Sequence, residues 1–151
     1  MEKYLRLLNP KTTNFEAIPS DSHGALTTAD ICTAMSYAKL TELENYLFSL
    51  YVFGPFALDK VNELSDLIFN NLNRADTSKS NIDHKKCIFI ALVELCYVSG
   101  DYKPSVSNRA LIGGVSRMQI HRKMGELVDY YKLVLMEIIT NIEGKIKETL
   151  K

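Results

Sequence analysis

Apolar residues along this chain recur at the three- and four-residue spacing of helices. Val61, Leu64, Leu67, Ile68 and Leu72 share one helical face, for example. No segment shows the alternation of apolar and polar residues that is typical of a half-buried strand. The pattern therefore predicts an all-α fold. The first helices are expected at about 28–38, 41–53, 55–73 and 82–98.

Polar and helix-breaking residues separate these segments. Asn9 to Ala25 contains prolines, a glycine and many small polar side chains, so residues 1–26 are expected to form an extended N-terminal arm. Thr27 is the predicted N-cap of the next helix, with Asp30 reaching back to it. Residues 27–151 are then expected to form one helical domain.

The segment over 82–98 is apolar on nearly every side and is predicted to be the central, most buried helix. Cys32, Cys87 and Cys96 lie far apart within apolar stretches, which favours reduced core thiols of a cytoplasmic protein. Neither the cysteines nor the three scattered histidines have metal-ligand spacing. No metal and no cofactor are expected.

A long amphipathic helix is predicted at the C-terminus, with a bend at Gly125 or Gly144. Its apolar stripe is read as core packing, and a self-association face is the alternative. The stripe consists of Leu127, Tyr131, Val134, Ile138, Ile142, Ile146 and Leu150.

The formal net charge is zero, so a role with nucleic acid must rest on local asymmetry. Residues 102–125 contain five lysines and arginines and no acid, whereas residues 40–66 contain five acids and one lysine. The longest apolar run, 87–98, is too short to cross a bilayer, which takes about 20 residues. The N-terminus shows no apolar signal core, so no secretion is expected.

The basic segment coincides with the spacing of a helix-turn-helix, expected at about 106–124. Ala110 is the small residue that lets the two helices cross closely. Gly114 takes the left-handed turn, and Val115 fills the gap between the helices. Ser116 caps the second helix, and Ile120 faces the core.

The outward side chains of this motif are of types that reach guanine, adenine and phosphate. The residues predicted to bind DNA are Asn108, Arg109, Ser116, Arg117, Gln119, His121, Arg122 and Lys123. Arg109, Gly113 and Lys123 occupy positions where apolar residues are commoner. An αα-hairpin with a solvated basic face is therefore the alternative reading.

The arrangement around the motif resembles the late-gene antiterminator Q proteins of lambdoid phages. Leu7 to Thr12 and the segment from Ser20 to Met35 resemble the family's opening. Ala57 to Leu72 resembles its early helix, and Ser107 to Ile139 its C-terminal helical region. The chain lacks the paired Cys-x-x-Cys zinc insertion of the larger members, so it is more similar to the compact type of phage 21.

The resemblance implies a non-enzymatic transcription antitermination factor of the host bacterial cytoplasm. Such a protein binds double-stranded DNA near a late promoter and loads onto RNA polymerase at a sigma-dependent pause. It then travels with the enzyme and makes it resist pausing and termination. The acidic stretch from Glu42 to Asp66 and the N-terminal arm are the candidate polymerase contacts, and self-association on DNA is the further interaction considered.

Three other functions remain open. A helix-turn-helix repressor or activator would stay on a palindromic site as a dimer formed through the C-terminal stripe. A protein-interaction module would be indifferent to changes at Arg117 and Arg122. An enzyme is the least favoured, because the sequence has no phosphate-binding glycine loop, no nucleophile beside a base and no metal-ligand spacing.

Overall fold

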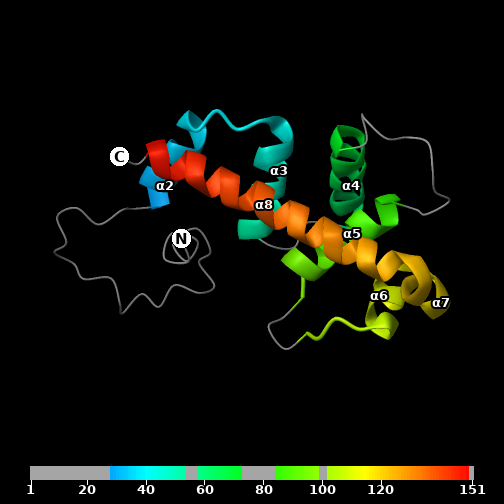
Figure 1. The fold of residues 1–151 in the computed structure, drawn as a ribbon. Coiled ribbons are helices and arrows are strands. Elements are labelled where there is room, and N and C mark those ends of the chain that lie inside the picture. The colour runs from blue at the N-terminus through cyan, green and yellow to red at the C-terminus, as the bar shows by residue number, and fades with distance from the viewer. Residues whose placement is uncertain (1–27, 54–57, 73–83, 99–101, 150–151) are drawn as a thin grey trace, which may run out of the picture. The chain divides into compact units, whose positions relative to one another are not determined.

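The computed structural model describes residues 28–53, 58–72, 84–98 and 102–149 (Figure 1). The predicted arm over 1–26, the predicted cap Thr27 and the end of the stripe at Leu150 lie outside these ranges. So do residues 73–83, which include the beginning of the helix predicted over 82–98.

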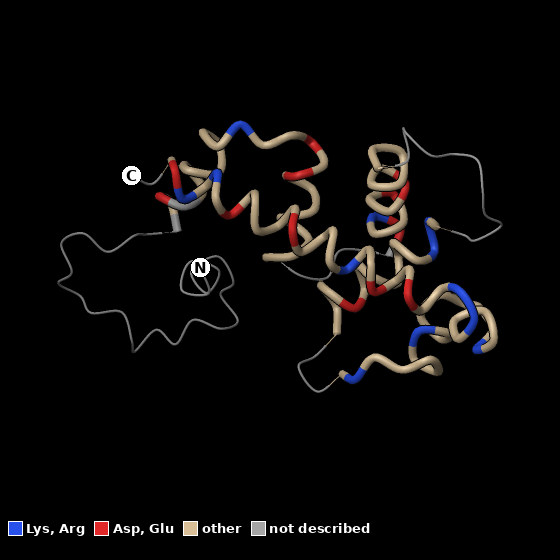
Figure 2. Tube along the Cα trace, viewed as in Figure 1, with Lys and Arg blue, Asp and Glu red and all other residues tan. Residues whose placement is uncertain are grey.

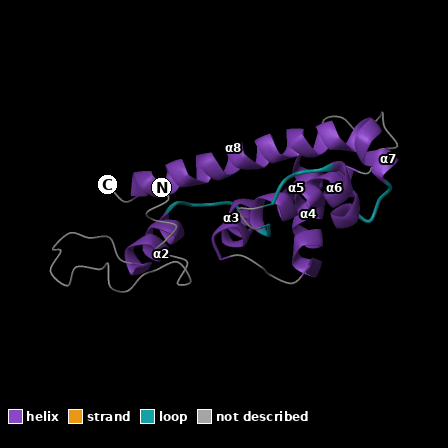
Figure 3. Cartoon of the chain, turned by 90° about the horizontal axis from the view of Figure 1, so that it is seen from below, coloured by secondary structure: helices purple, strands orange, loops and turns teal. Residues whose placement is uncertain are grey.

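Within the described residues every regular element is a helix, and Figure 3 shows loops but no strands between them. The predicted all-α fold is confirmed. The elements are α2 (Thr28–Tyr37), α3 (Glu42–Phe53), α4 (Leu58–Leu72), α5 (His84–Cys96), α6 (Val106–Gly113), α7 (Arg117–Gln119), the π-helical turn η2 (Ile120–Met124) and α8 (Gly125–Thr149).

The chain divides into two compact units. Unit 1 contains α2, α3 and the end of α8 from Ile139 onward. Unit 2 contains α4 to α7, η2 and the first part of α8, through Ile138. The long helix α8 therefore supplies residues to both units.

In unit 1, α3 begins with a capping box. The Thr41 backbone N–H donates to Glu44 Oε2 at 2.9 Å, and the Glu44 N–H donates to Thr41 Oγ1 at 3.2 Å. The other oxygen of Glu44 accepts a hydrogen bond from Lys145 Nζ at 2.6 Å, which ties α3 to α8. The buried apolar residues of this unit include Leu47, Phe48, Ile142 and Ile146.

In unit 2, α4 packs against α5, and α5 packs against α6. The predicted face of α4 is buried at Val61, Leu64 and Ile68, whereas Leu72 at its end is exposed. The prediction that the helix over 82–98 lies in the core is confirmed by α5. On α5 the buried residues are Cys87, Ile88, Ile90, Ala91, Leu92 and Glu94.

The three cysteines differ in their environments. Cys87 is buried, as predicted, and burial raises the pKa of the partly exposed Cys96 to about 12. Cys32 is exposed on α2, so its assignment to the core is wrong. Its neighbour Ala34 takes the buried position on that helix instead.

The buried stripe of α8 is shifted from the predicted one. Tyr131, Ile142 and Ile146 are buried as expected, but Leu127, Val134 and Ile138 are only half-buried. The fully buried positions next to them are Val128, Leu135 and Ile139. Both sets of positions lie on the uninterrupted helix α8, in adjoining rows of one broad apolar side, and the row with Val128, Leu135 and Ile139 is the one that faces the core.

Candidate nucleic-acid interface

The turn of the predicted motif is a left-handed cap that closes α6. Gly114 has φ 59° and ψ 36°, and its N–H donates to Leu111 O at 3.4 Å. The N–H of Val115 donates to Ala110 O at 3.1 Å, so the carbonyls of Ala110 and Leu111 near the end of α6 are satisfied. Ala110 is buried. The left-handed turn predicted at Gly114 is confirmed, and the close helix crossing predicted at Ala110 stays a prediction.

The second helix of the motif begins with a capping box. Ser116 Oγ accepts from the Gln119 backbone N–H at 3.2 Å, as predicted for an N-cap. The Ser116 N–H in turn donates to Gln119 Oε1 at 2.9 Å. Adenine is read by both ends of a glutamine amide. Because Gln119 Oε1 is committed to the cap, we assign Gln119 to the motif's own structure rather than to base recognition.

The second helix turns toward the core through η2. Ile120 and Met124 are both buried, which confirms the predicted direction of Ile120. The Gly125 N–H donates to Ile120 O, closing a π-helical turn. A Cβ on residue 125 would lie 3.0 Å from that same oxygen, so the glycine permits the turn. The bend predicted at Gly125 or Gly144 stays a prediction: a π-helical turn precedes Gly125, and α8 continues through Gly144.

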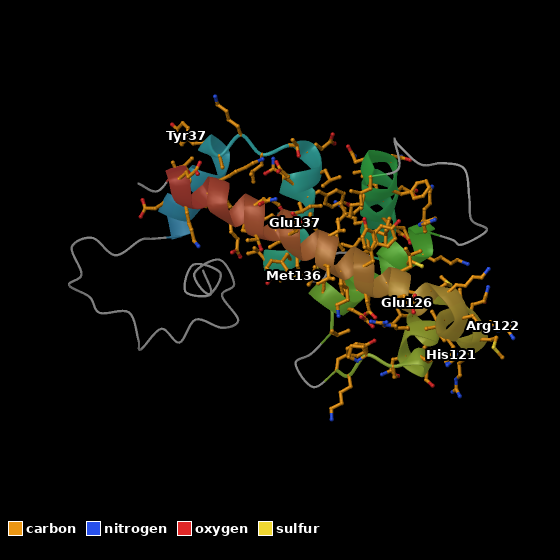
Figure 4. All side chains as sticks on the ribbon, viewed as in Figure 1. Tyr37, His121, Arg122, Glu126, Met136 and Glu137 are labelled. Atoms are coloured by element: carbon orange, nitrogen blue, oxygen red, sulfur yellow. The ribbon has the colours of Figure 1, made fainter. Side chains whose placement is uncertain are left out.

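The exposed positions of this segment form a basic surface, which consists of Arg117, His121, Arg122 and Lys123. All four side chains are exposed. Figure 2 shows the basic positions gathered where α7 passes into η2, and Figure 4 shows Arg122 pointing away from unit 2. Met118 lies among them and is 56% exposed. The segment 117–123 contains no acidic residue, so this basic surface can approach a polyanion.

Asn108, on α6, is exposed but not unconstrained. Its backbone N–H donates to Ser105 Oγ at 3.1 Å, which caps α6. Its side-chain Nδ2 donates to Lys103 O at 3.1 Å. We therefore place Asn108 at the edge of the motif, where it orders the approach to α6.

Arg109 corrects the sequence-based prediction, because it faces the core and not the solvent. Its Nε donates to Glu94 Oε1 at 2.8 Å and its Nη2 to Glu94 Oε2 at 3.0 Å. Nη2 also donates to Asp129 Oδ1, and Nη1 donates to Gly125 O at 3.1 Å. The side chain is only 9% exposed. A guanidinium held in this way cannot contact DNA, and it instead joins α6 to α5 and to the start of α8.

Glu94 is the centre of this ionic cluster. Burial alone would raise its pKa, but hydrogen bonds from Arg109, Tyr102 and Lys132 outweigh burial and hold the pKa below its ordinary value. Tyr102 donates to Glu94 Oε1 at 2.8 Å, and Lys132 Nζ donates to Oε2 at 3.2 Å. Burial and the bond to Glu94 raise the pKa of Tyr102 to about 12. The carboxylate therefore stays ionised at neutral pH with all its partners bound.

Sequence reasoning missed Glu94 and Met118. Glu94 is the single charged residue in the apolar run over 87–98, and a lone charge in such a run predicts a buried partner. That partner could have been sought among the basic residues placed at apolar positions of the motif, of which Arg109 is one. Met118 gave no such signal, because a methionine at that position fits the core equally well.

No family model matches the chain, and no curated protein or solved structure matches it either. Among the described helices, none is both long enough and apolar enough to cross a membrane.

Proposed function

We propose that this chain is a phage transcription antitermination factor that binds double-stranded DNA through the basic surface of α7 and η2. The single observation that carries DNA binding is the combination of a left-handed turn at Gly114, a capped second helix and an outward basic surface. A helix with its first turn free and cations on one side fits the major groove. Antitermination itself is supported by the sequence resemblance to the Q proteins.

Among the residues predicted to bind DNA, those with exposed side chains and no role in holding the motif together support the proposal best. Arg117, His121 and Arg122 lie on the exposed side and can reach base edges or phosphates, and Lys123 can neutralise a phosphate. Met118 adds an apolar contact of the kind that recognises the thymine methyl group. Ser116, Gln119 and Arg109 hold the motif in shape, so their replacement would act on folding first.

In this proposal the factor loads onto RNA polymerase held at a sigma-dependent pause near the late promoter. In the cytoplasm of the host bacterium, the factor then leaves the promoter together with the transcribing polymerase. The net charge is zero and the basic surface is local. This supports the proposal, because DNA would bind at the basic surface and leave other surfaces of the protein available to RNA polymerase.

The proposal is tested by transcription in vitro on the phage's own late promoter, followed by a distant terminator. We expect the protein to increase read-through only when its DNA element is present at loading. Excess element DNA added after polymerase has left should not reverse the effect. The double variant Arg117→Ala/Arg122→Ala should fail, and Lys147→Ala, an exposed lysine near the end of α8, serves as the matched control.

A repressor that stays on DNA predicts a different result. It would block initiation once its site is occupied, and it would not affect a terminator downstream. Promoter occlusion without read-through would therefore refute antitermination and leave DNA binding in place. If the Arg117→Ala/Arg122→Ala variant keeps the activity of the wild type, whether read-through or promoter occlusion, the assignment of DNA binding to the basic surface is refuted.

A further inference from the structure

The outward side of α8 in unit 2 carries large apolar side chains next to acids. Leu133 is 72% exposed and Tyr130 is 57% exposed. Both lie opposite the buried stripe that contains Val128 and Leu135, because they are offset from it by about half a helical turn. Tyrosine is enriched in protein interfaces, and a leucine exposed three residues further along the same side extends the apolar contact that Tyr130 offers.

Acidic residues flank this apolar pair at both ends. Glu126 lies seven residues before Leu133 and Glu137 lies four after it, so the three share one side of the helix. Both glutamates are exposed, and neither forms a salt bridge with another described residue. Figure 4 shows Glu126 and Glu137 on the same helix, at either end of this segment.

The charges argue against a second copy of this chain as the occupant. A parallel pair of α8 helices would place Glu126 against Glu126 and Glu137 against Glu137 of the copy. An antiparallel pair centred between Tyr130 and Leu133 would place Glu126 against Glu137 of the copy. Like charges facing each other across a helix pair disfavour both arrangements.

We propose that this surface, formed by Glu126, Tyr130, Leu133 and Glu137, docks a helix of another protein that presents apolar side chains flanked by lysine or arginine. Leu133 and Tyr130 supply the apolar contact, and the two glutamates pair with cations at either end of the bound helix. The inference does not depend on DNA binding, since the residues of the basic surface take no part in it.

The test selects partners without assuming their sequence. A library of displayed random peptides of about four helical turns is panned on the full chain and depleted on the Leu133→Asp variant. We expect the enriched peptides to carry a net positive charge and apolar residues at helical spacing. No enrichment, or enrichment of neutral or acidic peptides, would overturn the proposal.

The best peptide is then synthesised, and its binding is measured by fluorescence anisotropy. Leu133→Asp should weaken binding by about tenfold or more. Glu126→Gln/Glu137→Gln should also weaken it and make it less sensitive to salt. Leu111→Asp is the matched control, because Leu111 is 85% exposed on a different helix, α6, and its replacement should leave binding unchanged.

Circular dichroism of each variant establishes that the helices are intact. Equal peptide binding by the wild type and Leu133→Asp would overturn the proposal. Sedimentation measures the oligomeric state of both proteins. If the wild type is a dimer and Leu133→Asp is a monomer, a second copy covers this surface and the proposal is overturned. A wild-type monomer that binds the basic peptide would support the proposal.

Discussion

The guanidinium of Arg109 on α6 donates hydrogen bonds to both oxygens of the buried Glu94 carboxylate on α5, at 2.8 and 3.0 Å. This bidentate pair fixes the first helix of the helix-turn-helix to the core helix of unit 2. A buried pair of this kind is costly to break from one side, because the remaining charge keeps its desolvation penalty without its partner.

Arg109→Met should therefore destabilise the protein by about 3–5 kcal/mol. The double variant Arg109→Met/Glu94→Leu should lose less than the sum of the single changes, since it leaves no buried carboxylate behind. Urea denaturation of the two single variants and the double variant measures this coupling. Strictly additive losses would contradict a direct interaction between the two side chains.

The same carboxylate predicts a loss of stability in acid. The pKa of Glu94 in the folded protein is below its ordinary value of 4.5, so the unfolded chain binds the proton more readily. Its contribution to stability is complete above about pH 4.5 and is lost as the pH falls through the lower folded value. The pKa values of Asp129 and Glu44 are also lowered, so these residues act in the same direction. Glu94→Gln should flatten the dependence of the unfolding free energy on pH below 4.5.

The loss of stability in Gly114 variants should depend on backbone strain and not on crowding by neighbouring atoms. A Cβ at this position meets nothing within 4 Å, but φ is +59°. Gly114→Ala should cost about 1–2 kcal/mol, Gly114→Val more and Gly114→Asn less, because asparagine tolerates the left-handed region. Thermal unfolding of the three variants provides the ranking. A valine variant as stable as the asparagine variant would contradict this reading of the turn.

The basic surface should contain two kinds of contact. Arg117→Ala should cost about 1–3 kcal/mol on the specific site and little on unrelated DNA, if Arg117 reads a base. Lys123→Ala should weaken binding to all sequences and reduce the salt slope by about one unit. Titrations of both variants at several salt concentrations distinguish the two kinds. Unchanged affinity in both variants would remove these residues from the interface.

Met118 should contact a thymine methyl group. Once the DNA element is known, replacing its thymines with uracil removes only methyl groups, which should weaken wild-type binding. Met118→Ala should bind both forms of the element equally, because the apolar partner of the methyl is gone. Gel-shift titrations of the two proteins on the two DNAs test the pairing. Equal binding of both DNAs by the wild type would exclude it.

The sequence predicted the helices and the turn because these depend on local rules. The capping residue Ser116 and the positive φ of Gly114 follow from residue type and spacing alone. The direction of Arg109 could not be predicted in this way, because it depends on Glu94, which lies fifteen residues earlier on another helix. The buried stripe of α8 was misplaced because apolar residues occupy adjacent positions there, such as Val134 and Leu135, and periodicity alone does not decide which of the two faces the core.

The π-helical turn η2 has an evolutionary consequence. It holds three residues of the basic surface and separates Arg117 from the residues that anchor α8 in the core, such as Val128. Loss or gain of one residue within 121–123 would turn Arg117 relative to Val128 by about 100°. The same change would turn the buried Ile120, so a lineage that acquired a new set of outward side chains through a single-codon insertion or deletion would also have to repack the core around Ile120.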